Sequence, residues 1–228
     1  MQYDLARMVA QARKTRRREI VFREVVLPKT LASDLYSAAY AGVIRAWTEA
    51  VPSIVAEYER TLSGMTQDAA ADISSVTVQV EAAITNLLVT VRVRLERWAR
   101  RVEEVQRQKW TAAVKQGTGL DINMLIGPSD ARETLGTMIE RNVALVKSVS
   151  DQARDRIGQE VFQGLSERKP ARDVAAAIRE DIAMSRRRAL NIASDQLSKA
   201  SESLNEERRR EAGLMAWEWV SSHKLQLS

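Results

Sequence analysis

Hydrophobic positions repeat every three or four residues along residues 68–115. The nine intervals between ten such positions average about 3.6 residues, the period of an α-helix with one apolar face. No glycine or proline interrupts residues 66–116, so the pattern predicts one helix there, about 75 Å long. The ten positions are Ile73, Val76, Val80, Ile84, Leu87, Val91, Leu95, Trp98, Val102 and Val105.

Two parts of this stretch also fit a different structure. Residues 76–80 and 89–95 alternate at period two and are rich in β-branched side chains, which favours strands. Two strands would need a turn between them, and the intervening Glu-Ala-Ala-Ile at 81–84 favours helix instead. The single helix is therefore the favoured prediction.

The segment before this helix predicts a pair of short helices. Thr30 or Ser33 can cap the first one, and Pro52 should break or kink it. A second segment then runs to Leu62 and stops at Ser63-Gly64. Together they are expected to form a hairpin-like unit, which with the long helix occupies residues 30–116.

Residues 117–128 are rich in glycine and read as a loop. Ser129 or Asp130 can cap a following helix, which is expected to end near Glu167. Its predicted apolar face consists of Ile139, Val143, Val146, Ala153, Ile157 and Val161.

The remainder of the chain predicts two helices and a strand. Pro170 precedes a short helix over 171–182, and Ser185 caps a further helix that stops at Gly213. Residues 214–220 alternate tryptophan with an acid, which is typical of a strand. The predicted fold class is therefore mainly α, an elongated long-helix bundle with a small C-terminal β element.

Composition narrows the chemistry that this chain can perform. Only 5% of residues are aromatic and there are 9 Gly and 4 Pro, which argues against an all-β fold. The chain has no cysteine and one histidine, which removes thiolate chemistry and most transition-metal sites. His223 stands in no catalytic motif. We therefore expect a non-enzyme without catalytic, cofactor or metal residues. No apolar run has transmembrane length, and no secretory signal is seen, so no membrane association is expected.

The formal charge of +5 is concentrated at the N-terminus. Residues 1–30 contain eight bases and three acids, so 8 − 3 = +5 accounts for all of it. This composition predicts a basic arm over residues 1–29 that contacts DNA phosphates without sequence preference. A solvated arm is the alternative. The candidate contact residues are Arg13, Lys14, Arg16, Arg17 and Arg18.

Three other arginine-rich stretches are interleaved with acids. They lie at 92–101, 186–188 and 208–210, and solvated helix faces are the favoured interpretation of all three. Tryptophans are the other conspicuous side chains, and each can serve as a core or an interface anchor. They are Trp47, Trp98, Trp110, Trp217 and Trp219.

The C-terminal 90 residues or so resemble the Mu F-like minor capsid (head morphogenesis) family of tailed phages. The resemblance lies in the order and spacing of a long helix from Ile139 to Gly164-Leu165, a short helix over 171–182, residues 185–193, and Glu211-Ala212-Gly213 leading into residues 217–220. Ser194-Asp195-Gln196 departs from the Arg-Thr-Glu-like stretch of the family. The family pattern continues past the strand, so the natural chain is expected to extend beyond Ser228.

This resemblance implies a structural protein of the phage head that acts at the portal vertex in procapsid assembly and in genome packaging or ejection. Residues 129–228 would form the family domain. The implied partners are the portal protein, the major capsid or scaffold protein, and packaged double-stranded DNA. The implied location is the head interior, after assembly in the host cytoplasm. Two alternatives are a non-specific DNA-binding helical protein and a coiled-coil interaction protein of another system.

A helix about 75 Å long should leave part of its apolar seam available to a partner such as the portal. We expect its central positions to be buried either within the chain or against that partner. The terminal tryptophans should pack together on one strand face. The predicted interface residues are Leu87, Val91, Leu95, Trp217 and Trp219.

Overall fold

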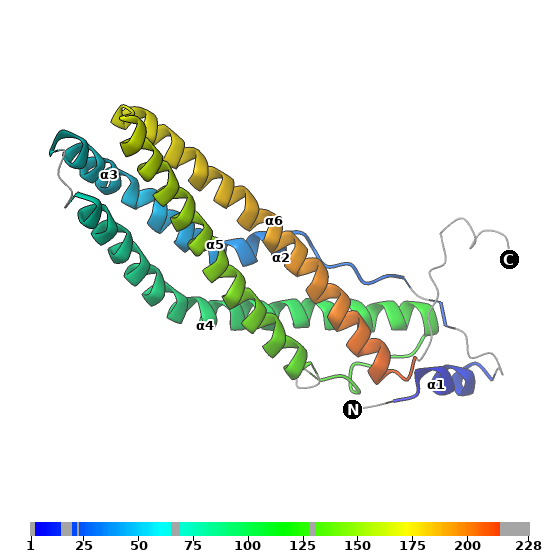
Figure 1. Ribbon diagram of the computed structural model, residues 1–228. Coiled ribbons are helices and arrows are strands. Elements are labelled where there is room, and N and C mark those ends of the chain that lie inside the picture. Colours follow the sequence, from blue (N-terminus) through cyan, green and yellow to red (C-terminus); the bar gives the residue numbers. More distant parts are fainter. Residues whose placement is uncertain (1–2, 15–19, 22, 65–68, 128–130, 215–228) are drawn as a thin grey trace, which may run out of the picture.

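Four long helices form an up-down-up-down bundle in the computed structural model of this chain (Figure 1). The structure describes residues 3–14, 20, 21, 23–64, 69–127 and 131–214. Each long helix packs on the next one, and α3 also packs on α6, which closes the ring. The elements are α1 (Leu5–Ala12), α2 (Thr30–Leu35), the π-helix η1 (Tyr36–Tyr40), α3 (Ala41–Gly64), α4 (Ala69–Thr118), α5 (Arg132–Glu167) and α6 (Ala171–Glu211).

Residues 30–64 form one continuous helical run and not the predicted hairpin-like pair. α2 begins at Thr30 and α3 ends at Gly64, as expected, but Lys29 occupies the N-cap position in place of Thr30 or Ser33, and Pro52 lies inside α3. Proline deprives the carbonyl of Thr48 of its helical partner, and both residues lie on the exposed face, where water can solvate that carbonyl. On the opposite face Val51 and Ile54 are buried. Their packing outweighs the local cost of the proline.

The prediction of a long helix over 66–116 is confirmed by α4, and the two-strand alternative is wrong. α4 contains 50 residues and is therefore about 75 Å long. Its neighbours fix its position: the indole Nε1 of Trp98 donates a hydrogen bond to the carbonyl of Leu31 at 2.8 Å. An ion pair between Arg154 and Glu81 at 2.6 Å joins α4 to α5. The predicted loop begins two residues later than expected, after Thr118.

α5 and α6 end where the sequence predicts, but α6 is one helix and not two. Ser185 does not cap a new helix, since it is buried in the middle of α6. α5 begins at Arg132, while the predicted caps Ser129 and Asp130 lie outside the described residues. α6 stops before Gly213, whose φ of 69° favours glycine. Leu214 and Gly213 donate back to the carbonyls of the last turn, a Schellman motif.

The turn between α5 and α6 depends on a close approach of three elements. A Cβ on Gly164 would lie 2.6 Å from Cγ2 of Val174 and 3.1 Å from the ring of Tyr58. The hydroxyl of Tyr58 donates to the carbonyl of Lys169 at 2.7 Å, which ties the end of α3 to this turn. Glycine is therefore required at position 164 for this end of the bundle to close.

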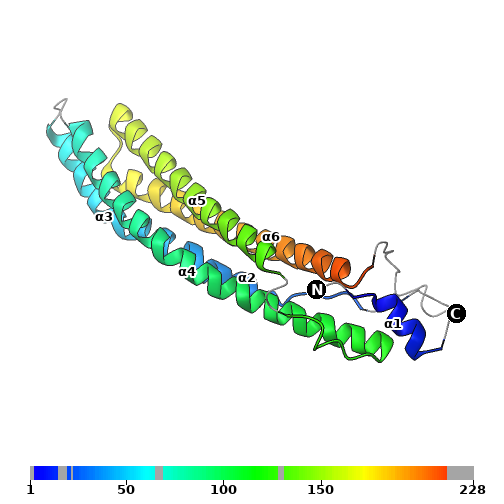
Figure 2. The ribbon, with the colours of Figure 1, turned by 90° about the horizontal axis from the view of Figure 1, so that it is seen from below.

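Two hydrophobic clusters stabilise the molecule. The larger one fills the bundle and contains Trp47 and Trp98. The smaller one lies at the C-terminal end of α4, where α1, the loop after α4 and the end of α6 meet (Figure 2). Its buried members are Leu5, Val9, Val25, Trp110, Val114, Ile122, Ile126 and Ala212. Part of the predicted basic arm is thus folded against the bundle.

The fold class is mainly α, as predicted, and the residues covered by the structure contain no strand. The expected strand over 214–220 lies outside the described residues apart from Leu214. Trp217, Trp219 and His223 lie outside them as well.

Candidate functional site

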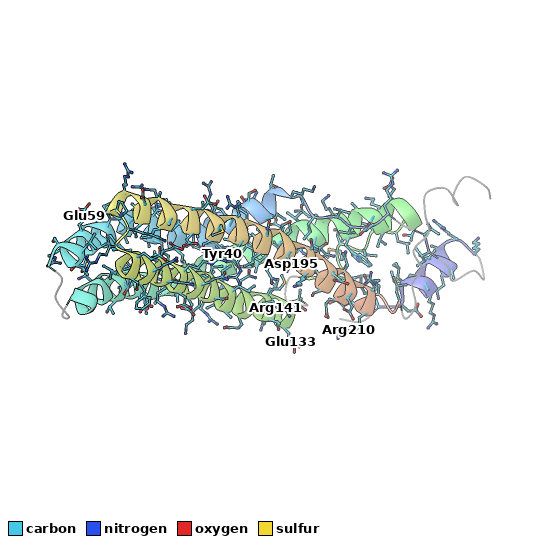
Figure 3. The ribbon with its side chains drawn as sticks, turned by 45° about the horizontal axis from the view of Figure 1, so that its top comes forward. Tyr40, Glu59, Glu133, Arg141, Asp195 and Arg210 are labelled. Carbon is cyan, nitrogen blue, oxygen red and sulfur yellow. The ribbon has the colours of Figure 1, made fainter. Side chains whose placement is uncertain are left out.

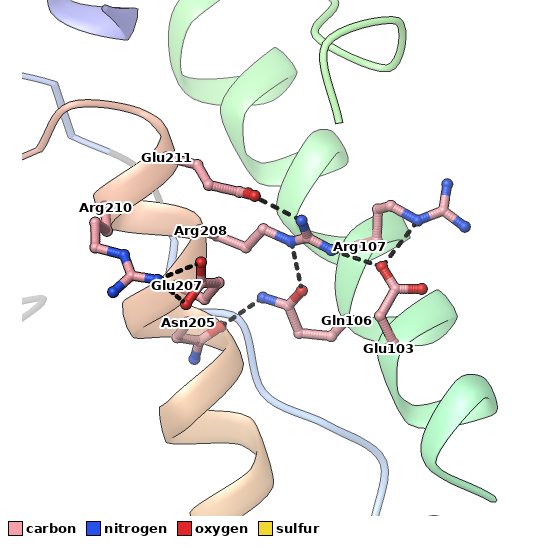
Figure 4. A network of polar contacts seen from close by, with 8 residues as sticks. All are labelled: Glu103, Gln106, Arg107, Asn205, Glu207, Arg208, Arg210 and Glu211. Atoms are coloured by element: carbon pink, nitrogen blue, oxygen red, sulfur yellow. Dashed lines mark hydrogen bonds and ion pairs between the residues drawn. The ribbon is translucent and has the colours of Figure 1, made fainter. Parts of the chain in front are cut away.

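A buried polar network joins α4 to α6 near the smaller cluster (Figure 4). The guanidinium of Arg208 is fully buried and donates to Glu103 at 2.5 Å, to Glu211 at 2.9 Å and to Gln106 at 3.4 Å. Gln106 in turn donates to the side chain of Asn205 at 2.9 Å. α4 and α6 are therefore joined here by charge as well as by hydrophobic packing.

The charges of this network are balanced by a second arginine. Arg107 donates to the same oxygen of Glu103 at 3.1 Å, so two guanidinium groups face the carboxylates of Glu103 and Glu211. Burying a charge costs several kcal/mol unless it is paired and hydrogen-bonded. Since each of these groups has a partner, the network restricts α4 and α6 to one relative register.

The prediction that residues 208–210 form a solvated face is wrong for Arg208. Arg208 lies four residues after the buried Leu204 on α6. It therefore continues the helical spacing of the buried residues of this helix. That spacing was a signal for burial, but the residue type suggested exposure. Arg210, by contrast, is exposed and pairs with Glu207 at 2.6 Å.

The N-terminal segment is attached to the end of α6 by its backbone. The amide of Tyr3 donates to the carbonyl of Glu211 at 2.8 Å, and that of Leu5 to the carbonyl of Ala212 at 3.1 Å. Asp4 caps α1 by accepting from the amide of Arg7. The first residues therefore satisfy carbonyls at the C-terminus of α6, which would otherwise need water.

The predicted phosphate-contact residues lie only partly within the described region. Arg13 and Lys14 follow α1 and are exposed. The guanidinium of Arg13 also donates to the carbonyl of Gly117 at 2.7 Å, next to the end of α4. Arg16, Arg17 and Arg18 lie outside the described residues, so DNA contact by the arm stays a prediction.

The predicted partner residues on α4 pack inside this chain. Leu95 is fully buried, Val91 is 3% exposed, and Leu87 is half-buried beside Gly42 of α3. Val91 and Leu95 therefore satisfy the first of the two expectations, burial within the chain, whereas Leu87 satisfies it only in part. Contact of these residues with a partner stays a prediction.

The outer face of α4 is divided into an uncharged part and a basic part. Charged side chains project outward along the whole bundle, Glu133, Arg141 and Arg210 among them (Figure 3). On α4, however, the exposed positions between 78 and 90 carry no charge. The exposed valines there and just beyond are Val78, Val89 and Val93, at 57%, 72% and 47%.

Asp181 is a buried carboxyl between α6 and α5. It is 8% exposed, and no ion pair or hydrogen bond to it occurs within the described part of the chain. Burial raises the pKa of the Asp181 carboxyl, the nearby charge of Glu160 raises that pKa further, and Arg156 lowers it. Asp195 on the same helix shows the opposite effect, because a hydrogen bond from Lys199 lowers the pKa of its carboxyl.

Replacing Asp181 by asparagine is expected to raise the free energy of unfolding near neutral pH, because a buried carboxylate without a partner is less favourable than a neutral amide. The folded-state pKa of this acid is raised, so the folded wild type binds its proton more tightly and loses stability as the pH rises through that pKa. Asparagine does not titrate, so the gain should shrink as the pH falls towards about 4. Urea unfolding at several pH values measures this difference.

Asp195→Asn is the matched control on the same helix. Its lowered pKa means that its carboxylate stabilises the fold above the unfolded-state pKa, so this variant should lose stability near neutral pH. A gain for Asp181→Asn that is the same at all pH values would contradict titration as the cause.

No group of three or more His, Asp or Glu side chains that could hold a metal ion occurs within the described ranges. No helix in these ranges is both long enough and apolar enough to cross a bilayer.

Comparisons with known proteins give one distant relative. An uncharacterized protein of Haemophilus influenzae is 29% identical to this chain over 110 residues. The aligned part is 48% of this chain and 25% of that protein, so the chain spans about a quarter of the relative's length. No family model matches the sequence, and no solved structure matches it.

Proposed function

We propose that this chain is a non-enzymatic structural protein of a tailed-phage head that acts at the portal vertex during assembly and genome packaging or ejection. The observation that carries the proposal is the Mu F-like order of elements in the C-terminal part. Two of its landmarks coincide with helix ends: Gly164-Leu165 lies in the last turn of α5, and Gly213 follows α6. The run over 171–193 departs from the expected pattern, because it belongs to a single helix.

The portal protein would dock on the outer face of α4, at its uncharged part and at the adjoining Val93. Leu95 and Val91 pack within this chain, whereas Val78, Val89 and Val93 expose aliphatic side chains on the opposite face. A partner helix can bury such a face by side-chain packing. The proposed portal contact is therefore this outer face and not the inner seam. The major capsid or scaffold protein and packaged DNA are further proposed partners.

Co-expression of the full chain with the portal protein of the same phage tests this function. Portal rings are expected to retain the wild-type chain during purification, and Val89→Glu with Val93→Glu should abolish retention. Both positions are exposed, so the double variant should keep its helical circular dichroism signal. Phe162→Glu on α5 is the control, since this side chain is 73% exposed but lies outside the proposed face.

Portal rings that emerge without the wild-type chain would reject the proposed function. Rings that retain the double variant as well as the wild type would reject the α4 face as the contact. A non-specific DNA-binding protein is the second candidate function, and the basic part of α4 favours it.

A further inference from the structure

Three arginines on the outer face of α4 have no partner within the described residues. Arg94, Arg97 and Arg100 are exposed, and neither an ion pair nor a hydrogen bond involves their side chains there. Arg101 is also exposed, and its one ion pair, with Asp34, is long at 4.0 Å. On α6, by contrast, most of the exposed arginines pair with a nearby acid. These are Arg172, Arg187 and Arg210.

Two neighbouring acids contact other side chains and not these three arginines. Glu96 lies 4.0 Å from Arg92, and Arg92 forms a closer ion pair with Glu140 of α5. Glu104, in the next turn, accepts a hydrogen bond from Gln108. Residues 92–101 contain five arginines and one glutamate, and because Arg92 is paired with Glu140 of α5, the positive surface consists of the other four arginines. It is a concentrated positive surface on a rigid helix.

We propose that this surface, defined by Arg94, Arg97, Arg100 and Arg101, binds the phosphodiester backbone of double-helical DNA. The first and last of these residues are seven positions apart, which is about 10 Å along an α-helix. Phosphates of one duplex strand recur about every 3.4 Å along the axis, so the row can face roughly three of them. Guanidinium groups are suited to phosphate because they donate two parallel hydrogen bonds.

The surface fits a duplex better than a single strand or an acidic protein. Proteins that bind single strands use exposed aromatic side chains on which bases stack, and the two tryptophans of α4, Trp98 and Trp110, are buried. A protein interface usually has an apolar centre, whereas the exposed valines described on α4, Val78, Val89 and Val93, all precede Arg94, and none lies among the three arginines that follow it. This inference rests on the charges of α4 and not on the proposed role in a phage head.

The test is binding of the full chain to duplex DNA of arbitrary sequence at several salt concentrations. The combined variant Arg94→Gln, Arg97→Gln and Arg100→Gln is expected to weaken binding at low salt at least about tenfold. Losing three phosphate contacts should also make the slope of log K against log salt shallower by about 2.7. Circular dichroism should show an unchanged helix content, because the three side chains are exposed.

The matched control removes the same charge from arginines that have partners. Arg172, Arg187 and Arg210 of α6 pair with Asp173, Glu180 and Glu207, and all three arginines are exposed. Their replacement by glutamine should change DNA affinity less than about threefold. Equal weakening by the two triple variants would overturn the proposal, because net charge alone would then explain binding.

Two further outcomes would also overturn it. An unchanged affinity of the α4 variant would assign DNA binding to another region, such as the N-terminal arm. Tighter binding to a single strand than to a duplex would reject the duplex as ligand. Portal retention is measured separately, so a wild-type chain that binds DNA through α4 but leaves portal rings bare would reject the proposed function and keep this inference.

Discussion

Replacing Arg208 by alanine is expected to lower the free energy of unfolding by about 3–5 kcal/mol. The guanidinium is fully buried and holds Glu103 and Glu211, so its removal leaves two buried carboxylates with fewer partners. The midpoint of urea unfolding, followed by circular dichroism, measures this loss. Arg208→Lys should lose less stability than Arg208→Ala, because lysine keeps the positive charge. It should still be less stable than the wild type, because lysine cannot make the same three hydrogen bonds.

Arg210→Ala is the control for this effect. Arg210 belongs to the same turn of α6, but it is exposed and its ion pair with Glu207 lies at the surface. Surface ion pairs contribute about 0–1 kcal/mol, so this variant should be nearly as stable as the wild type. Equal losses for Arg208→Ala and Arg210→Ala would contradict the role of the buried network.

The second large effect is expected for Leu95→Ala, at about 2–5 kcal/mol of lost stability. Leu95 is fully buried in the larger cluster, so its truncation leaves a cavity between α4 and the helices that cover it. Val89→Ala, at a position that is 72% exposed on the same helix, should change stability by less than about 0.5 kcal/mol. Thermal unfolding of the two purified variants compares them directly.

This pair of variants also separates stability from partner binding. If Leu95 served a partner and not the core, its replacement by alanine would leave the isolated chain as stable as the wild type. A stability loss at Leu95 alone would mean that portal-binding assays should use positions on the outer face, such as Val89 and Val93.

The long helices were predictable because their apolar periods run without interruption. α4 matches its prediction closely, since neither glycine nor proline occurs within residues 66–116. The ends of α5 and α6 followed from Pro170 and Gly213, which act through backbone geometry alone. Signals of this kind do not depend on what packs against them.

The errors arose where tertiary packing overrides a local preference. Pro52 breaks a helix in isolation, yet α3 continues because its opposite face is buried. Ser185 favours a helix start, but the buried positions Ile182 and Ala189 continue one apolar period across it. In both cases the spacing of the hydrophobic residues predicted the helix more accurately than the single proline or serine did.

The buried network could be predicted only in part. The spacing of α6 places Arg208 on the buried face, but an arginine is buried only when its partners are supplied, and these lie about a hundred residues away on α4. The unpaired state of Arg94, Arg97 and Arg100 was equally hidden. The sequence shows Glu96 and Glu104 beside them, whereas the structure shows that Arg92 and Gln108 already engage these acids.

The attachment of Tyr3 and Leu5 to Glu211 and Ala212 has a consequence for the order of folding. These partners are separated by about 208 residues, so the ribosome must complete α6 before α1 can dock. At about 5–20 residues per second this delay is on the order of 10–40 s. During that time Leu5 and Val9 of α1 can pack only on the earlier members of the smaller cluster, such as Trp110 and Val114 of α4. α1 can therefore complete its packing only after the end of α6 has been synthesised.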